Sequence, residues 1–269
     1  MSACRAVAQE EFLKFLVFRC AFPRDLDTQI IGAWARATAK TQGDQNLCQP
    51  DIIHLRHIFR KLHLSIRTEL RPMIIPSYNL KYGANTQVYN QDIQLCLLRK
   101  IAFTFKDPIK RRRVYRNPLI SKAVTAILDL MADIDCNDEL SDGVPLPTIA
   151  FAISVIEQAL EEWHTGKFVQ RREICTTAHH CLRFSQHLRT LQAIDVRAQK
   201  KLRARLFVEA RYDILLTMRD LACAAKEAEE DELEEDNDDE RNSRELALNS
   251  GRILGDGEWR FHLRPRTKF

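Results

Sequence analysis

Residues 146–166, LPTIAFAISVIEQALEEWHTG, decide the fold of this chain. Pro147 suits the first turn of a helix, where its missing N–H is not needed. The side chains that follow are apolar on every face of such a helix, which is typical of a helix in the middle of a core. Trp163 fills a large volume near its end, and Gly166 can adopt the left-handed conformation that terminates a helix. We therefore expect a buried central helix near residues 147–164.

Outside this stretch, apolar residues recur at helical spacing, whereas the alternation typical of strands is nearly absent. Asn117 is expected to cap a helix that starts at Pro118, and Asp25 or Asp27 to cap an earlier one. Pro72 is expected to end or kink the third helix. The remaining helices are expected near residues 3–20, 29–40, 50–71, 92–105, 119–131, 169–191 and 194–225, with a loop over 76–90. The predicted fold is all-α, a single multi-helix globular domain of about eight helices with a long C-terminal helix.

The composition is that of an ordinary globular protein, with 45% apolar and 29% charged residues among 269. No stretch of about 18 uncharged apolar residues occurs, so we expect no membrane-spanning helix and no membrane partner. The cysteines are scattered, which favours reduced thiols in an intracellular protein. They stand at positions 4, 20, 48, 96, 136, 175, 181 and 223.

The net charge of +4 conceals a strong asymmetry. Residues 227–240 contain eleven acids and no base, and without them 26 acids face 41 bases, a charge of +15. A basic body attracts polyanions or its own acidic segment. We expect a helical domain over 1–226, an acidic and disordered linker over 227–250, and a short basic and apolar tail over 251–269. The acidic run is interpreted as a solvating linker, a site for a basic partner, or a segment that folds back on the basic face.

The central stretch resembles an uncharacterised domain-of-unknown-function family that is abundant in mushroom-forming basidiomycete fungi. The resemblance is carried by Leu146-Pro147-Thr148-Ile149-Ala150 and by Glu162-Trp163-His164-Thr165-Gly166. Weaker likenesses are Ala21-Phe22-Pro23 and Tyr115-Arg116-Asn117-Pro118, which extend the resemblance to roughly residues 20–215. It implies a helical intracellular fungal domain with no defined catalytic residues.

Two groups of basic residues form the candidate nucleic-acid-binding site. In the first group, guanidinium groups suit phosphate oxygens and the neighbouring tyrosine could stack on a base. In the second, the residues stand four apart and so share one face of the last helix. The first group is Lys110, Arg111, Arg112, Arg113, Tyr115 and Arg116; the second is Arg197, Lys201 and Arg205. A solvated basic flank is the alternative for both groups, and for a similar row formed by Arg56, Arg60, His63 and Arg67.

A further group holds Cys175, His179, His180, Cys181 and His187. Cys175 and His179 are one helical turn apart, a spacing that can present two zinc ligands on one face. This is a single half-site, because no second Cys-x-x-Cys or His-x-x-x-His pair accompanies it; His54 and His57 are the candidates to complete it. We therefore expect a packed thiol beside surface histidines, with no metal and no cofactor.

Short motifs of the common enzyme classes are absent, including Gly-rich phosphate loops, G-x-S-x-G and H-E-x-x-H. Glu157 and Glu161 share a face of the central helix, where they form either a carboxylate pair or its polar edge, paired with arginine. The polar edge is the favoured interpretation. No catalytic residue is predicted, and the chain is not expected to be an enzyme.

These features predict a non-catalytic intracellular interaction domain. The leading hypothesis is a protein of the nucleus rather than the cytoplasm, bound to DNA, RNA or chromatin through a basic surface. The alternative is a protein–protein adaptor whose partners are acidic or basic proteins, and an unrecognised enzyme is a third possibility. One continuous positive face would favour nucleic acid, whereas basic residues dispersed among acids would favour the adaptor.

Overall fold

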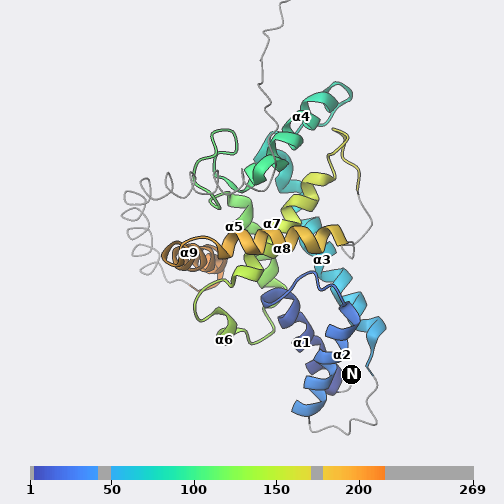
Figure 1. Cartoon of the computed structure of the whole chain (residues 1–269). Helices are drawn as coiled ribbons and strands as arrows, with labels where there is room; N and C mark the ends of the chain where they lie inside the picture. The colour runs from blue at the N-terminus through green and yellow to red at the C-terminus, as the bar shows by residue number, and fades with distance from the viewer. Residues whose placement is uncertain (1–2, 42–49, 171–177, 216–269) are drawn as a thin grey trace, which may run out of the picture.

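The computed structural model describes residues 3–41, 50–170 and 178–215 (Figure 1). Within these ranges every regular element is helical, which confirms the predicted all-α fold. The elements are α1 (Ala3–Phe18), α2 (Leu26–Lys40), α3 (Ile52–Tyr78), η1 (Ala84–Thr86), α4 (Gln87–Leu98), η2 (Arg99–Thr104), α5 (Pro118–Asp129), α6 (Asn137–Leu140), α7 (Leu146–Glu161), α8 (Ala178–Gln192) and α9 (Val196–Leu215). None of these described helices is both long and apolar enough to cross a membrane.

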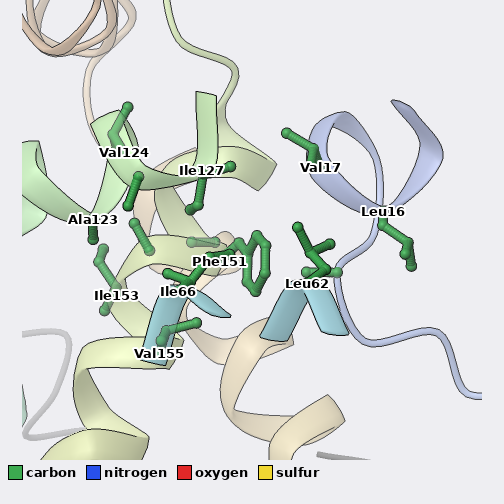
Figure 2. Close-up of a cluster of buried hydrophobic side chains, with 14 of the residues drawn as sticks. Leu16, Val17, Leu62, Ile66, Ala123, Val124, Ile127, Phe151, Ile153 and Val155 are labelled. Carbon is green, nitrogen blue, oxygen red and sulfur yellow. The ribbon is translucent and has the colours of Figure 1, made fainter. Parts of the chain in front are cut away.

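Helix α7 lies at the centre of the fold, with α3, α5 and α8 packed around it (Figure 1). Residues 148–160 of α7 are all buried, as expected for a helix that is apolar on every face. Figure 2 shows Phe151 and Val155 of α7 among side chains from α1, α3 and α5. The hydroxyl of Thr148 donates to the carbonyl of Val17 in α1 at 2.9 Å, so the one polar group near the start of α7 is satisfied.

Helix α3 is longer than the sequence suggests, because it continues past Pro72 and Pro76 to Tyr78. The expectation that Pro72 ends this helix is wrong, and so is the expectation that residues 76–90 form a loop throughout. A proline inside a helix costs about 3 kcal/mol through a lost hydrogen bond and a steric clash. Ile74 and Tyr78, which follow Pro72 in α3, are buried, and this burial offsets the cost.

Two predicted helix caps are present. Asn117 accepts a hydrogen bond from the N–H of Leu119 at 2.9 Å, ahead of Pro118 in the first turn of α5. Asp25, rather than Asp27, caps α2 by accepting from the N–H of Thr28 at 3.0 Å. In each cap a side-chain oxygen, from the Asn117 amide or the Asp25 carboxylate, accepts from an N–H group that has no backbone partner at the start of the helix.

Other boundaries differ from the predictions. The helix expected over 92–105 is α4, which begins at Gln87, and it gives way to η2, where Lys100 and Ile101 are left-handed. Part of the helix expected over 169–191 lies outside the described residues; Val169 and Gln170 are not helical, and α8 starts at Ala178. The last helix is described up to Leu215, so the acidic linker and the tail predicted after it lie outside the described residues.

Candidate functional site

The basic loop, residues 106–116, joins η2 to α5 and is folded by its own hydrogen bonds. The N–H of Lys106 donates to the carbonyl of Arg113 at 3.0 Å, and the Asp107 carboxylate accepts two N–H groups of the turn that follows. These bonds hold the loop in a defined shape. Of its basic side chains, Lys106, Lys110 and Arg112 are exposed, and Arg111, Arg113 and Arg116 are partly exposed.

Tyr115 does not share the exposure of the loop. Its side chain is only 2% exposed, and its burial raises the pKa of the hydroxyl, which therefore stays protonated. Its backbone is left-handed, with a φ of 58°. The expected stacking of this ring on a base does not fit its position in the core. The position of Tyr115 just after a run of arginines predicts a surface residue, and nothing in the local sequence indicates that its side chain points into the core.

Helix α9 meets the basic loop through Arg205. Its Nη2 donates to the carbonyl of Tyr115 at 2.7 Å, while its Nε lies 3.5 Å from the Glu209 carboxylate. Arg205 is thus a tie between two segments that are 90 residues apart in sequence. On the same helix Arg197 is exposed and Lys201 partly exposed. The two predicted basic groups therefore adjoin in space.

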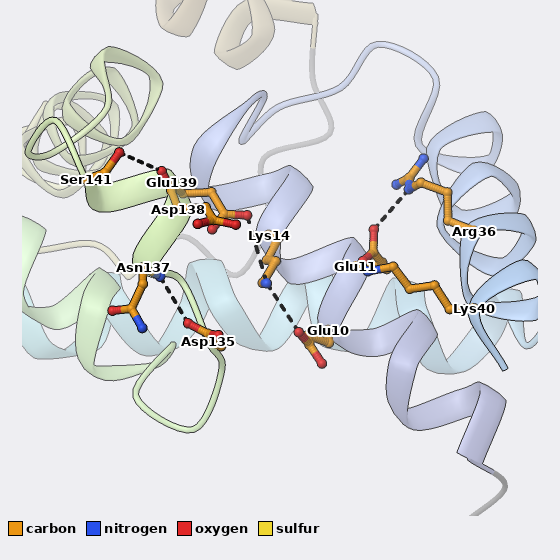
Figure 3. Close-up of polar contacts among 10 residues, drawn as sticks. All are labelled: Glu10, Glu11, Lys14, Arg36, Lys40, Asp135, Asn137, Asp138, Glu139 and Ser141. Atoms are coloured by element: carbon orange, nitrogen blue, oxygen red, sulfur yellow. Dashed lines mark hydrogen bonds and ion pairs between the residues drawn. The ribbon is translucent and has the colours of Figure 1, made fainter.

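Basic residues at the α1–α2 end of the fold are arranged differently. Figure 3 shows Glu11 of α1 between Arg36 and Lys40 of α2, and Lys14 between Glu10 and Glu139. The Glu11 carboxylate lies 3.1 Å from Arg36 Nε and 2.5 Å from Lys40 Nζ. Positive and negative side chains are paired here, and such pairing weakens the attraction of this surface for a polyanion.

The basic row predicted on α3 does not form one surface. Arg56 and Arg60 are exposed, and Arg56 pairs with Asp27 of α2. His63 and Arg67 are buried. The interpretation of this row as a single solvated flank is wrong, because His63 is buried and Arg67 is buried beside a carboxylate that directly follows α7.

The carboxylate in question belongs to Glu162, directly after α7, and it is fully buried. Arg71 of α3 binds it with both arms of its guanidinium group, at 2.8 Å and 2.7 Å, and Arg67 Nε lies 3.8 Å away. Bidentate pairing of this kind is the strongest form of arginine–carboxylate contact. It ties α3 to the C-terminal end of the central helix.

Glu157 and Glu161 do not act as a carboxylate pair. The buried Glu157 accepts a hydrogen bond from His187 of α8 at 2.8 Å and lies 3.4 Å from Arg183 Nε. Burial opposes ionisation of Glu157, but these contacts outweigh it and lower its pKa, so the group is a carboxylate. The favoured interpretation of a polar edge is confirmed for Glu157, with a histidine as well as an arginine as its partners.

The predicted cysteine and histidine group is divided by the structure. His187 belongs to the buried pair with Glu157, Cys181 is a partly buried free thiol, and Cys175 lies outside the described residues. His179 and His180 instead lie near Glu161, with one potential ligand atom from each residue within 4.8 Å of the others. His54 and His57 do not belong to this described group. No local spacing relates Glu161 to the histidines, so the sequence gives no signal of this group.

A model of a protein family, described as a domain of unknown function (DUF6532), matches residues 7–194. The chain belongs to the DUF6532 family. The match begins earlier than the expected residue 20 and ends before α9, so the family segment contains the basic loop but not Arg197, Lys201 or Arg205. The search of curated proteins and the search of solved structures find no match.

Residues 162–166 form a structural junction in this chain. Trp163 is buried and its ring packs near Tyr82 and Phe168, with centroids 5.6 Å and 5.8 Å away. Gly166 has a φ of 75° and lies against the backbone of Gln87 in α4. Together with the ion pair of Glu162, these residues fix α3 and α4 to the end of α7. Their contacts account for a role in folding.

Proposed function

We propose that this DUF6532 protein is a non-catalytic, nuclear interaction domain that binds DNA or RNA through one basic surface. The basic surface comprises Lys110, Arg111, Arg112, Arg113 and Arg116 of the loop and Arg197, Lys201 and Arg205 of α9. The observation that carries the proposal is the bond from Arg205 to the carbonyl of Tyr115, which places the two segments side by side. The fungal origin implied by the family resemblance belongs to the same proposal.

The charge along both segments supports this function. Residues 108–128 contain six bases and no acid, and residues 196–208 contain five bases and no acid. Four acids flank these segments in sequence: Asp107 caps the turn of the loop, Asp129 ends α5, Asp195 accepts N–H groups at the start of α9, and Glu209 pairs with Arg205. A surface with one sign of charge attracts a phosphate backbone, in contrast to the paired charges around Glu11.

The mode of binding that this surface supports is contact with phosphates. Arginine and lysine neutralise phosphate groups without reading the sequence, and the buried Tyr115 adds no stacking platform. We therefore expect binding that depends steeply on salt and little on base sequence. The slope of log K against log salt should be about −0.9 for each phosphate that is neutralised on duplex DNA.

The test is a fluorescence anisotropy titration of the full chain against labelled duplex DNA, single-stranded DNA and RNA. It is run at about 50 mM and about 150 mM salt, because affinity for phosphates changes strongly over this range. The variant Lys110→Gln/Arg112→Gln/Arg197→Gln removes three exposed charges from the basic surface. The control Arg19→Gln/Arg36→Gln/Lys40→Gln removes three exposed charges from the α1–α2 end.

The surface variant should bind at least tenfold more weakly and show a flatter salt slope, while the control stays within about twofold of wild type. Equal losses in both variants would reduce the effect to net charge and refute a defined surface. No binding at low salt would also refute the proposal, and an adaptor that recognises an acidic protein would then be tested next. Replacing the acids of residues 227–240 by amides in the full chain should tighten binding if that run competes for the same surface.

A further inference from the structure

Three potential metal ligands meet where α7 ends and α8 begins. Glu161 is the last residue of α7, and His179 and His180 are in the first described turn of α8. One carboxylate oxygen and one nitrogen from each imidazole all lie within 4.8 Å of one another. His179 is exposed and the other two are partly buried, so an ion can reach the group from solvent.

The chemistry of this set is that of a transition-metal site. Two histidines and one carboxylate bind zinc in several enzymes, and the same set with open positions holds non-haem iron. Ligand atoms that share a tetrahedral ion at about 2.1 Å lie about 3.4 Å apart. Each distance between two ligand atoms therefore has to contract by at most about 1.4 Å, a movement that small rotations of the three side chains can supply.

The surroundings of the group favour a cation. Glu157 lies one helical turn before Glu161, and its buried carboxylate interacts electrostatically with His179. Its charge is shared with Arg183, whose Nε lies 3.4 Å away. The ring of His180 is held almost parallel to that of Phe22, with centroids 6.3 Å apart and an angle of 18°. The negative charge of Glu157 and the packed ring of His180 support a metal site here, because contacts around the ligands orient them and tune the ion.

We propose that Glu161, His179 and His180 bind one divalent transition-metal ion, with Zn²⁺ as the best-fitting occupant. The three residues supply three ligands, and a water molecule completes a tetrahedral site. The ion would join the end of α7 to the start of α8, on the face of α7 where Glu157 already pairs with α8. The site uses no residue of the basic surface, so it stands independently of nucleic-acid binding.

The test is a titration of the full chain with Zn²⁺ by isothermal calorimetry, after dialysis against a chelator, and with Co²⁺ by visible absorption. His179→Ala removes an exposed ligand, and Glu161→Gln keeps the shape of the carboxylate. The matched controls are His57→Ala and His164→Ala, which remove exposed imidazoles outside the group. Circular dichroism verifies that every variant keeps the helical fold.

We expect one ion per chain, an affinity at least tenfold weaker in both ligand variants, and controls that match wild type. Unchanged affinity in His179→Ala would overturn the proposal, as would the absence of binding at about 100 μM Zn²⁺, a concentration far above the dissociation constant of a functional zinc site. A sulfur-to-cobalt charge-transfer band that persists in His179→Ala would show that cysteines hold the ion, and would overturn it as well.

Discussion

Replacing Gly166 by alanine should destabilise the fold strongly, because two separate costs fall on this position. Its φ of +75° is left-handed, a conformation that costs an alanine about 1–2 kcal/mol. A Cβ atom would also lie 1.9 Å from the carbonyl oxygen of Gln87, where ordinary contact begins at 3.4 Å. Helix α4 would have to retreat by about 1.5 Å to make room for the methyl group.

That retreat would break a buried hydrogen bond. The side-chain amide of Asn90, in α4, donates to the carbonyl of Gly166 at 2.9 Å. A buried polar group left without its partner costs about 1–3 kcal/mol. With the backbone strain, the total loss is about 2–5 kcal/mol, a large part of the roughly 5–15 kcal/mol that stabilises a folded domain. For a domain of this size the melting temperature should fall by roughly 4–20 °C.

Alanine substitutions at two other glycines separate the cost of backbone strain from the cost of the steric clash, with urea unfolding and thermal melts as the measurements. Gly83 has a φ of +138° but no atom within 3.7 Å of an added Cβ, so Gly83→Ala measures backbone strain alone, about 1–3 kcal/mol. Gly32 lies inside α2 with only the end of the Arg36 side chain nearby, so Gly32→Ala should stabilise by about 0.5–1 kcal/mol. If Gly166→Ala costs no more than Gly83→Ala, the close approach of α4 to the end of α7 is refuted.

Three further outcomes are expected. Burial lowers the pKa of His63 to about 3, whereas the pKa is about 6.5 in the unfolded chain. The free energy of unfolding should therefore be unaffected by His63 above pH 6.5 and should fall below it, by about 2 kcal/mol at pH 5. In urea titrations with chelator present, His63→Phe should flatten that pH dependence, and an unchanged slope would show that His63 is protonated in the folded state. Glu162→Leu leaves the buried Arg67 and the partly buried Arg71 without their carboxylate and should cost about 3–5 kcal/mol. Glu11→Leu, whose partners Arg36 and Lys40 are exposed, should cost under about 1 kcal/mol, and similar costs would contradict the buried pairing. Asn117→Ala removes the cap of α5 and the hydrogen bonds from the side-chain amide to the carbonyls of Phe103 and Phe105. Differential scanning calorimetry should therefore show that the free energy of unfolding falls by about 2–4 kcal/mol. A fall below about 1 kcal/mol would contradict the role of Asn117 in holding the start of α5.

The features that could be predicted from the sequence are those set by neighbouring residues. The apolar stretch of α7 identifies a buried helix because burial on every face needs no knowledge of the partner helices. Asn117 and Pro118 identify the start of α5, because a cap acts on the next two or three N–H groups. The continuation of α3 through Pro72 depends instead on burial of side chains beyond it, which local propensity does not contain.

The candidate sites depend on contacts between distant segments. Arg71 and Glu162 are 91 residues apart, and Arg205 and Tyr115 are 90 apart. Sequence spacing places the arginines on helix faces but does not say which carboxylate or carbonyl each will meet. For the same reason the sequence favours Tyr115 as a surface ring, although a left-handed backbone turns it into the core.

The three carboxylates at the end of α7 now have distinct partners. Glu162 binds arginines of α3, Glu157 binds His187 of α8, and Glu161 lies beside the histidine pair. The first two are buried and neutralised within the fold, so their loss should appear as lost stability. Glu161 is partly exposed and His179 is exposed, so their loss should appear as lost metal affinity with the fold intact. Because the basic surface lies on the loop and α9, a variant that loses metal and keeps nucleic-acid binding would show that two separate sites share one helical scaffold.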